Sequence, residues 1–412
     1  MFEDYEDPKV RAKTVERLGS GGRTTLLGPG ALLETGALAR RLGMGRALVV
    51  TDRHLVDGEA LRTLRQRLEA EGIRTAVTTD VTSPPLESDI QAGVRVCLGT
   101  ACDGIVTLGG GSVHDVGKAV AVLAAQGGSV HEYAEDALGA RRRRVERKLP
   151  HIAVSTTAGT GAEISSFAFV TETAGHAHAV LHDPRLVPDA TVIDPLTHTT
   201  MPGEVTAATG MNALSSAVEA FLSLAHTVQS DEAALEAMRA IRDSLPKAYE
   251  DGRDLDARGA MAKAAYQAGV AFDEAGLGIV DSISLVLSSV YSLPHSLANA
   301  IVLPYAMAYD AGSEDRMRQI AEALGKKPGR DPAEAAIDAV KRLRERVGIT
   351  QDLGGLGLDE DIVYLCADRI LHHPFMRRNP RVVDRDGLVG ILLDALGEQR
   401  IEVSKGRIEG RP

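Results

Sequence analysis

The chain has 412 residues, 44% of them hydrophobic and 25% charged, which is typical of a globular protein with room for two or three domains. Its formal net charge of −11 argues against nucleic acid and against an anionic membrane as partners. Tryptophan is absent and aromatic residues make up only 3% of the chain, so nothing favours a surface for stacking bases or sugars. The 3 cysteines lack the spacing of a zinc site, and we expect a reducing, cytoplasmic location. We find no apolar run of the ~20 residues needed to span a bilayer, and the acidic N-terminus is unlike a signal peptide.

The first half of the sequence predicts strands alternating with helices. Residues 1–24 are polar, and we expect them to form a peripheral arm. The elements predicted after them are a helix over 31–43, a strand over 45–52, a helix over 57–71, strands over 74–79 and 104–109, a strand over 149–155 and a hairpin-like segment over 166–193. Such alternation predicts βαβ units and a parallel sheet, which binds its ligands at the carboxyl ends of the strands.

The most informative stretch is Gly104–Lys118, where a short apolar strand runs into Gly109, Gly110 and Gly111 and then into a helical pattern. Bare backbone N–H groups at a helix N-terminus, together with the helix dipole, favour an anion such as a pyrophosphate. The spacing matches neither the G-x-G-x-x-G fingerprint nor a Walker loop. A glycine-rich turn without a ligand therefore stays open as the alternative.

Polar residues follow two other predicted strands. Asp52 ends the 45–52 strand, where a carboxylate can bind the hydroxyls of an adenosine ribose and repel a 2′-phosphate. The alternative is that Asp52 is a turn or helix-capping residue. Thr156, Thr157 and Thr160 follow the 149–155 strand and could line the other side of a phosphate or nicotinamide site.

From Met201 onward the pattern is helical and rich in Ala, Leu and Ser. The predicted helices are 204–224, 231–245, 257–275, 278–291, 297–311, 314–324, 332–347, 360–369 and 386–396. We therefore expect two domains: an α/β nucleotide-binding domain over 1–197 and a helical domain over 198–412.

Over Thr25–Leu396 the chain resembles the iron-containing (group III) alcohol dehydrogenases of the dehydroquinate synthase-like superfamily. The motifs that carry the resemblance are Thr51-Asp52, Gly109–Ser112 with Asp115 and Lys118, Thr156–Thr160 with Glu163, Ile193–Pro195, Ala207–Met211, Gly276–Gly278, Leu293–His295, Ala298–Ala300 and Asn379–Arg381.

The resemblance implies a Rossmann-like N-terminal domain with a parallel sheet, an all-α C-terminal domain and an active site in the cleft between them. It implies that Gly110, Gly111 and Ser112 hold the pyrophosphate and that Asp52 favours NAD over NADP. It also implies that Thr156, Thr157 and Thr160 flank the cofactor. His178 aligns with a family lysine that contacts the cofactor ribose. A homodimer is common among such proteins.

The sequence departs from the family at the metal site. The resemblance implies an Asp and a His four residues apart and two further histidines, but these positions hold Asn212, Ser216, Asp281 and His295. A further family histidine with a proton-relay role aligns with Leu285. An amide and a hydroxyl are poor ligands for iron. We therefore expect a degenerate site without catalytic metal, in which something else must polarise the substrate carbonyl.

The replacement residues suggest how that could happen. Asn212 and Ser216, together with nearby serines, could donate neutral hydrogen bonds to an oxyanion. Asp281 and His295 could form an acid–base pair in which each shifts the pKa of the other toward neutrality. The alternative is that Asp281 is a satisfied buried carboxylate and that the serines only allow close helix packing. These serines are Ser215, Ser282, Ser284, Ser288 and Ser289.

The sequence thus predicts an NAD(H)-dependent oxidoreductase that interconverts a small aldehyde or ketone and its alcohol without iron. Two alternatives stay open. One is a redox-neutral lyase, cyclase or isomerase that uses the same cleft, and the other is a catalytically silent nucleotide-binding relative.

Overall fold

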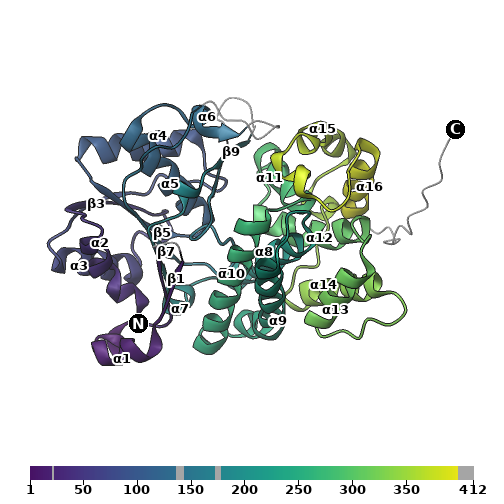
Figure 1. Cartoon of the computed structure of the whole chain (residues 1–412), viewed down its shortest axis with the longest axis horizontal. Coiled ribbons are helices and arrows are strands. Elements are labelled where there is room, and N and C mark those ends of the chain that lie inside the picture. Colours follow the sequence, from purple (N-terminus) through teal and green to yellow (C-terminus); the bar gives the residue numbers. More distant parts are fainter. Residues whose placement is uncertain (21–22, 136–142, 172–177, 398–412) are drawn as a thin grey trace.

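A computed structural model describes residues 1–20, 23–135, 143–171 and 178–397. One half of the molecule is an α/β layer structure and the other half is helical, with α8 and α10 lying where the two halves meet (Figure 1). The fold is therefore the predicted combination of an α/β domain and an all-α domain.

The main sheet has seven strands in the order β1-β2-β10-β7-β5-β3-β4. All neighbouring pairs are parallel except β1 and β2. The strands are β1 Glu16–Ser20, β2 Arg23–Leu27, β3 Arg46–Val50, β4 Arg74–Thr78, β5 Gly104–Gly109, β7 His151–Ser155 and β10 Ala190–Ile193. Every residue of β5, β7 and β10 is buried, because helices cover both faces of a parallel sheet.

Each face of the sheet has its own hydrophobic core. Val49 points into the core beneath η2 (Ala31–Glu34), α2 (Thr35–Arg41) and α3 (Glu59–Ala70). Its neighbours Leu48 and Val50 point into the opposite core, beneath α4 (Glu87–Gly99) and α5 (Gly111–Gln126). This is the alternation that a period of two residues imposes on a strand. The sheet is fixed from both sides, so the loops at its carboxyl edge project from a rigid base.

Two sequence-based predictions about the first half were wrong. Residues 1–24 are not a peripheral arm, because β1 and the start of β2 form one side of the sheet and β2 pairs with β10. Polar side chains are usual on such outer strands, which is why the pattern looked unstructured. The 166–193 segment is only partly a hairpin. β8 (Phe167–Thr171) pairs with β9 (His178–His182) beside β6 (Ala134–Glu135), while Ala190–Ile193 enters the main sheet.

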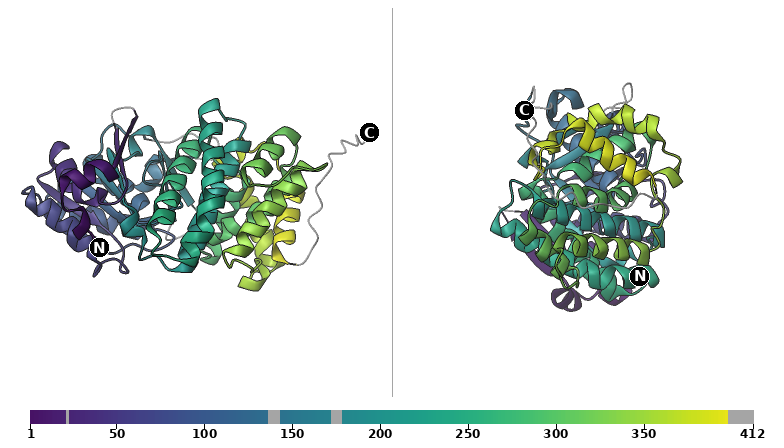
Figure 2. Two further views of the ribbon diagram at one scale, coloured as in Figure 1. Left: turned by 90° about the horizontal axis from the view of Figure 1, so that it is seen from below. Right: turned by 90° about the vertical axis from the view of Figure 1, so that its right-hand side faces the viewer.

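The predicted helices of the second half are present. They are α8 Gly203–Leu222, α9 Val228–Glu250, α10 Leu255–Ala275, α11 Ile279–Tyr291, α12 His295–Tyr309, α13 Glu314–Ala323, α14 Pro332–Arg346, α15 Glu360–Leu371 and α16 Arg385–Leu396. One large hydrophobic core joins them, and they stack into a compact helical mass beside the α/β half (Figure 2). Within the described ranges, none of these helices is long and apolar enough to cross a membrane.

Candidate active site

A cleft of about 1360 Å³ lies between the sheet edge and the helices. The loops after β3, β5 and β7 line one side, and α8, α11 and the start of α12 line the other. Eleven of the twelve residues selected from the sequence line this cleft: Asp52, Gly110, Gly111, Ser112, Thr156, Thr157, Thr160, Asn212, Ser216, Asp281 and His295. Residues up to about 240 positions apart therefore meet at one site.

The glycine turn connects β5 to α5. Gly110 is the N-cap of α5 and Gly111 is its first residue, so the first N–H groups of the helix lack intrahelical partners. The threonine loop lies opposite. A Cβ on Gly110 would lie 3.1 Å from Thr157 Cγ2, and a Cβ on Gly111 would lie 2.9 Å from Thr160 Cγ2. A side chain at either position would crowd the threonine loop, which fits a backbone cradle for a phosphate group.

Asp52 follows the end of β3 and lines the cleft. Its Oδ1 accepts hydrogen bonds from the backbone N–H groups of His54, at 2.8 Å, and Leu55, at 3.2 Å. The turn-forming role considered from the sequence is therefore present. In the described structure Oδ2 makes no hydrogen bond, which leaves one carboxylate oxygen for a ligand.

Thr156 closes the same edge of the sheet, because its N–H donates to Gly109 O at 3.0 Å and ties the β7 loop to the glycine turn. His178 is the first residue of β9, paired with Thr171. The side chain of His178 lies outside the described part of the structure, so its predicted contact with a ribose stays a prediction.

The four candidate catalytic residues form one cluster. Asn212 and Ser216 are one turn apart on α8, so both side chains face the cleft. Asp281 is in the first turn of α11. His295 begins α12, with its Nε2 3.1 Å from Asp281 Oδ1.

Asn299 is a central member of this cluster that the sequence reasoning left without a role. Its Nδ2 donates to Asn212 Oδ1 and to Asp281 Oδ1, the latter at 3.1 Å, and lies 3.2 Å from His295 Nε2. Because Nε2 cannot both donate to Asp281 and accept from Asn299, the two contacts alternate with the tautomer of the imidazole. The available signal was the spacing, since Asn299 lies one helical turn after His295.

The pKa of Asp281 does not move toward neutrality, so that prediction was wrong. Burial opposes its ionisation, but the attraction of His295 and hydrogen bonds from His295 and Asn299 outweigh burial and lower the pKa. Asp281 is therefore a carboxylate that orients the imidazole and stabilises it when it becomes charged.

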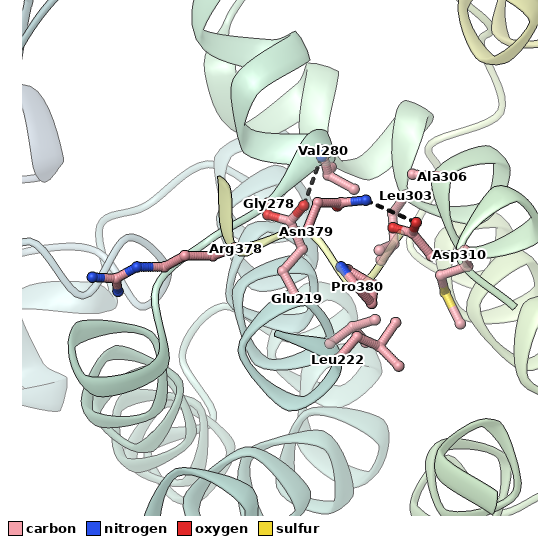
Figure 3. Close-up of a pocket in the computed structure, with 12 residues that line it drawn as sticks. Glu219, Leu222, Gly278, Val280, Leu303, Ala306, Asp310, Arg378, Asn379 and Pro380 are labelled. Carbon is pink, nitrogen blue, oxygen red and sulfur yellow. Dashed lines mark hydrogen bonds between the residues drawn. The ribbon is translucent and has the colours of Figure 1, made fainter. Parts of the chain in front are cut away.

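The turn that carries Asp281 is held by Glu219, a buried residue of α8. Glu219 accepts hydrogen bonds from the N–H groups of Val280, at 2.6 Å, and Asp281, at 3.3 Å. Asn379 assists by accepting from Ile279 N and donating to Asp310 Oδ1 at 2.9 Å. Figure 3 shows Glu219 pointing at the start of α11, with Asn379 reaching past it to Asp310. Burial, followed by repulsion from Asp281, raises the pKa of Glu219 to about 8.

Asp115 is another buried carboxyl that lines the cleft. Its Oδ1 has no hydrogen-bond partner among the described residues. Burial raises its pKa to about 7, although the nearby Lys118 opposes the shift. The Lys118 ammonium is itself buried and donates to Ser165 Oγ and Phe167 O.

Most of the serines considered as oxyanion donors are occupied elsewhere. Ser282, Ser288 and Ser289 donate to the backbone oxygens of Gly278, Leu293 and Val286. The buried hydroxyls of Ser215 and Ser284 make no hydrogen bond in the described structure. Neither residue lines the cleft, so packing explains them. Ser216 remains the serine of this set whose hydroxyl is available at the catalytic cluster.

The donor set does not fit a tightly held iron. It offers one carboxylate and one imidazole, with an amide and a hydroxyl in the other two positions, and the Asn212 amide oxygen already accepts from Asn299. Within the described ranges no three His, Cys, Asp or Glu side chains are grouped so that they could hold a metal ion. Iron sites in proteins use several imidazole or carboxylate ligands.

These features define a two-domain protein in which a glycine-rich strand-to-helix turn of the α/β half faces a cleft closed by helices. Comparison with known proteins agrees. Residues 22–195 match the model of the iron-containing alcohol dehydrogenases, and residues 206–396 match the C-terminal model of the same family. The chain therefore belongs to the iron-containing alcohol dehydrogenase family.

Individual relatives align over nearly their whole length. The NAD-dependent methanol dehydrogenase of Bacillus methanolicus is 34% identical over 90% of this chain and 98% of its own. The 1,3-propanediol dehydrogenase of Klebsiella pneumoniae is 36% identical over 89% of this chain and 96% of its own. The crystal structure of a 1,3-propanediol oxidoreductase superposes with a TM-score of 0.86 at 34% identity, covering 90% of this chain and 97% of that one.

Proposed function

We propose that the protein is an NAD(H)-dependent dehydrogenase that interconverts a small aldehyde or ketone and the corresponding alcohol without tightly bound iron. The observation that carries the proposal is that an open glycine cradle and a hydrogen-bonded His–Asp pair line one cleft. The NAD-dependent relative named above supports the choice of cofactor.

The α/β half supplies the cofactor site. Gly110, Gly111 and Ser112 would hold the pyrophosphate through backbone N–H groups, and Thr157 and Thr160 would close the other side. Asp52 would bind the adenosine ribose through its second oxygen. When bound, NAD supplies the hydride acceptor or, in its reduced form, the hydride donor.

The helical half supplies the proton. His295 is the group placed to give a proton to the substrate oxygen during reduction and to take it during oxidation. Asp281 stabilises the charged imidazole, and Asn299 fixes both side chains. Asn212 and Ser216 offer neutral donors for the developing negative charge, a role that a metal ion would otherwise fill.

The test uses the intact protein after dialysis against a chelator. We expect it to bind NADH and to oxidise it with propanal and butanal. His295→Ala should lower kcat by about 10²–10⁴-fold with little change in NADH affinity. If NADH binds but no aldehyde or alcohol changes its fluorescence, the proposal fails. A substrate consumed without net NADH change would indicate redox-neutral chemistry instead. The predicted homodimer can be checked on the same sample by light scattering.

A further inference from the structure

Four phenylalanines form a cluster beside the catalytic end of the cleft. They are Phe167 and Phe169 on β8, Phe272 on α10, and Phe375 in η5 (Pro374–Arg378). The whole chain has only 6 phenylalanines and no tryptophan. An aromatic-poor protein thus places most of its phenylalanines at one location.

The cluster is built as a fixed wall. Phe167 and Phe169 are two residues apart on one strand, so they share a face, and their rings are parallel within 2° with centroids 6.3 Å apart. Phe375 meets both edge-on, at 5.4 and 5.8 Å. The His182 ring stacks on Phe167, with ring centroids 4.1 Å apart. Such contacts hold the rings in one orientation.

The wall faces the cleft through two of its members, since Phe169 and Phe272 line it while Phe167 and Phe375 support them. Phe169 is partly exposed there. The backbone of Phe169 lies close enough to the Asp115 carboxyl to lower its pKa, and the charges of His295 and Asp281 also act on the pKa of Asp115. Ser282, the residue after Asp281, contacts His373 at 3.3 Å, two residues before Phe375. The wall therefore adjoins the catalytic cluster.

The described residues around this end of the cleft offer no lysine or arginine to pair with an anionic substrate. Among the described residues that line the cleft, Arg53 is the one Lys or Arg, and it follows Asp52 at the opposite, adenosine-binding end. Lys118 lies behind the wall and its ammonium is used by Ser165 and Phe167. Two further side chains that line the cleft, Leu277 and Leu285, are apolar.

We propose that the substrate of this site is an uncharged aldehyde or alcohol that carries an aromatic ring, which packs against Phe169 and Phe272 while its oxygen reaches His295. The inference rests on the proposed dehydrogenase function. It adds that a flat apolar group, rather than a polyol or a charged group, occupies the pocket. Phe side chains offer such a ring both buried area and favourable edge or offset contacts.

The experiment separates binding from turnover. With saturating NADH present, an alcohol cannot be oxidised, so the Kd of benzyl alcohol and of 1-propanol can be measured directly by calorimetry. We expect benzyl alcohol to bind at least about tenfold more tightly. Phe169→Leu should abolish most of this preference, and Phe169→Tyr, which keeps the ring, should retain it.

Turnover is then measured with benzaldehyde, propanal and 4-carboxybenzaldehyde. We expect kcat/KM to be highest for benzaldehyde and to fall at least about tenfold for the carboxylated analogue. Equal Kd values for the two alcohols would overturn the proposal of an aromatic pocket. So would a Phe169→Leu variant that loses the same factor of affinity for both alcohols. A clear benzyl alcohol preference with no turnover of any aldehyde would instead reject the dehydrogenase function.

Discussion

The Glu219 side chain accepts a hydrogen bond from the backbone N–H of Asp281, so one buried carboxyl holds the helical turn that carries another. Glu219 also accepts from Val280 N, so it provides acceptors for two of the first N–H groups of α11, which lack partners within the helix. The position of Asp281, and through it that of His295, depends on a residue that does not itself line the cleft. Glu219 is therefore a positioning residue for the proposed catalytic pair.

The buried Glu219 should make stability depend on pH. Its pKa rises from 4.5 to about 8 on folding because of burial and the charge of Asp281. The folded state therefore binds the proton more tightly than the unfolded state, and the stability that Glu219 contributes is present below pH 4.5 and lost as the pH rises through 8. Glu219→Gln removes this ionisation. We expect the Tm of wild type to fall relative to the Tm of Glu219→Gln between pH 5 and about 8.5. The fall should be equivalent to a few kcal/mol of unfolding free energy.

A suitable control is Glu204→Gln, since Glu204 is on the same helix but exposed. Its Tm difference from wild type should not vary with pH over the same range. A Tm difference for Glu219→Gln that is equally flat would show that Glu219 does not ionise in this window.

The glycine cradle can be tested by adding one methyl group. In Gly111→Ala the new Cβ would lie 2.9 Å from Thr160 Cγ2 and occupy space next to the helix N-terminus. We expect the Kd for NADH to rise at least about tenfold, because a bound phosphate needs close approach to the backbone. Gly99→Ala is the matched control, since a Cβ there meets nothing within 4 Å. If fluorescence titration gave the same Kd for NADH in Gly111→Ala and in wild type, the glycine turn would not be part of the cofactor site.

The sequence predicted the fold well where local pattern and tertiary packing agree. The helices of the second half and the central strands β3, β5 and β7 were all predicted, because their apolar periodicity matches the faces they bury. The prediction was wrong at β1 and β2. β1 pairs with β2, and β2 pairs with β10, about 165 residues away. No local pattern records that distant contact.

The cleft was predicted at the level of residue identity but not of chemistry. Spacing placed Asn212 and Ser216 on one helix face, and the structure puts them beside Asp281 and His295. The sequence-based prediction assigned no role to Asn299, although its spacing from His295 was a signal. It also assigned none to Glu219, whose role depends on how α8 packs against α11. The sequence-based prediction also gave the wrong direction for the pKa shift of Asp281. That pKa is set by partners that only the folded chain brings within hydrogen-bond distance.

Coenzyme preference provides a test of Asp52. Asp52→Asn keeps an acceptor for the N–H groups of His54 and Leu55 but removes the charge that would repel a 2′-phosphate. We expect the ratio of kcat/KM with NADPH to that with NADH to rise at least about tenfold. Asp57→Asn, which changes an exposed carboxylate five residues away, should leave the ratio unchanged. If the ratio were the same in both variants, Asp52 would serve only to form its turn and would not select the cofactor.

The proposal that the site lacks tightly bound iron can be tested by rebuilding the metal ligands. Asn212→Asp combined with Ser216→His would place two further ligands beside Asp281 and His295, giving two carboxylates and two imidazoles, a set that suits iron or zinc. We expect the double variant, grown with added iron, to purify with about one metal ion per chain and wild type with well under one, by mass spectrometry of the metal content. Each single variant serves as a control, because three strong ligands should hold the metal less tightly than four. Wild-type protein that keeps one iron per chain through dialysis against a chelator would show that an amide and a hydroxyl suffice here, and the proposed role of Asn212 and Ser216 as hydrogen-bond donors would have to be abandoned.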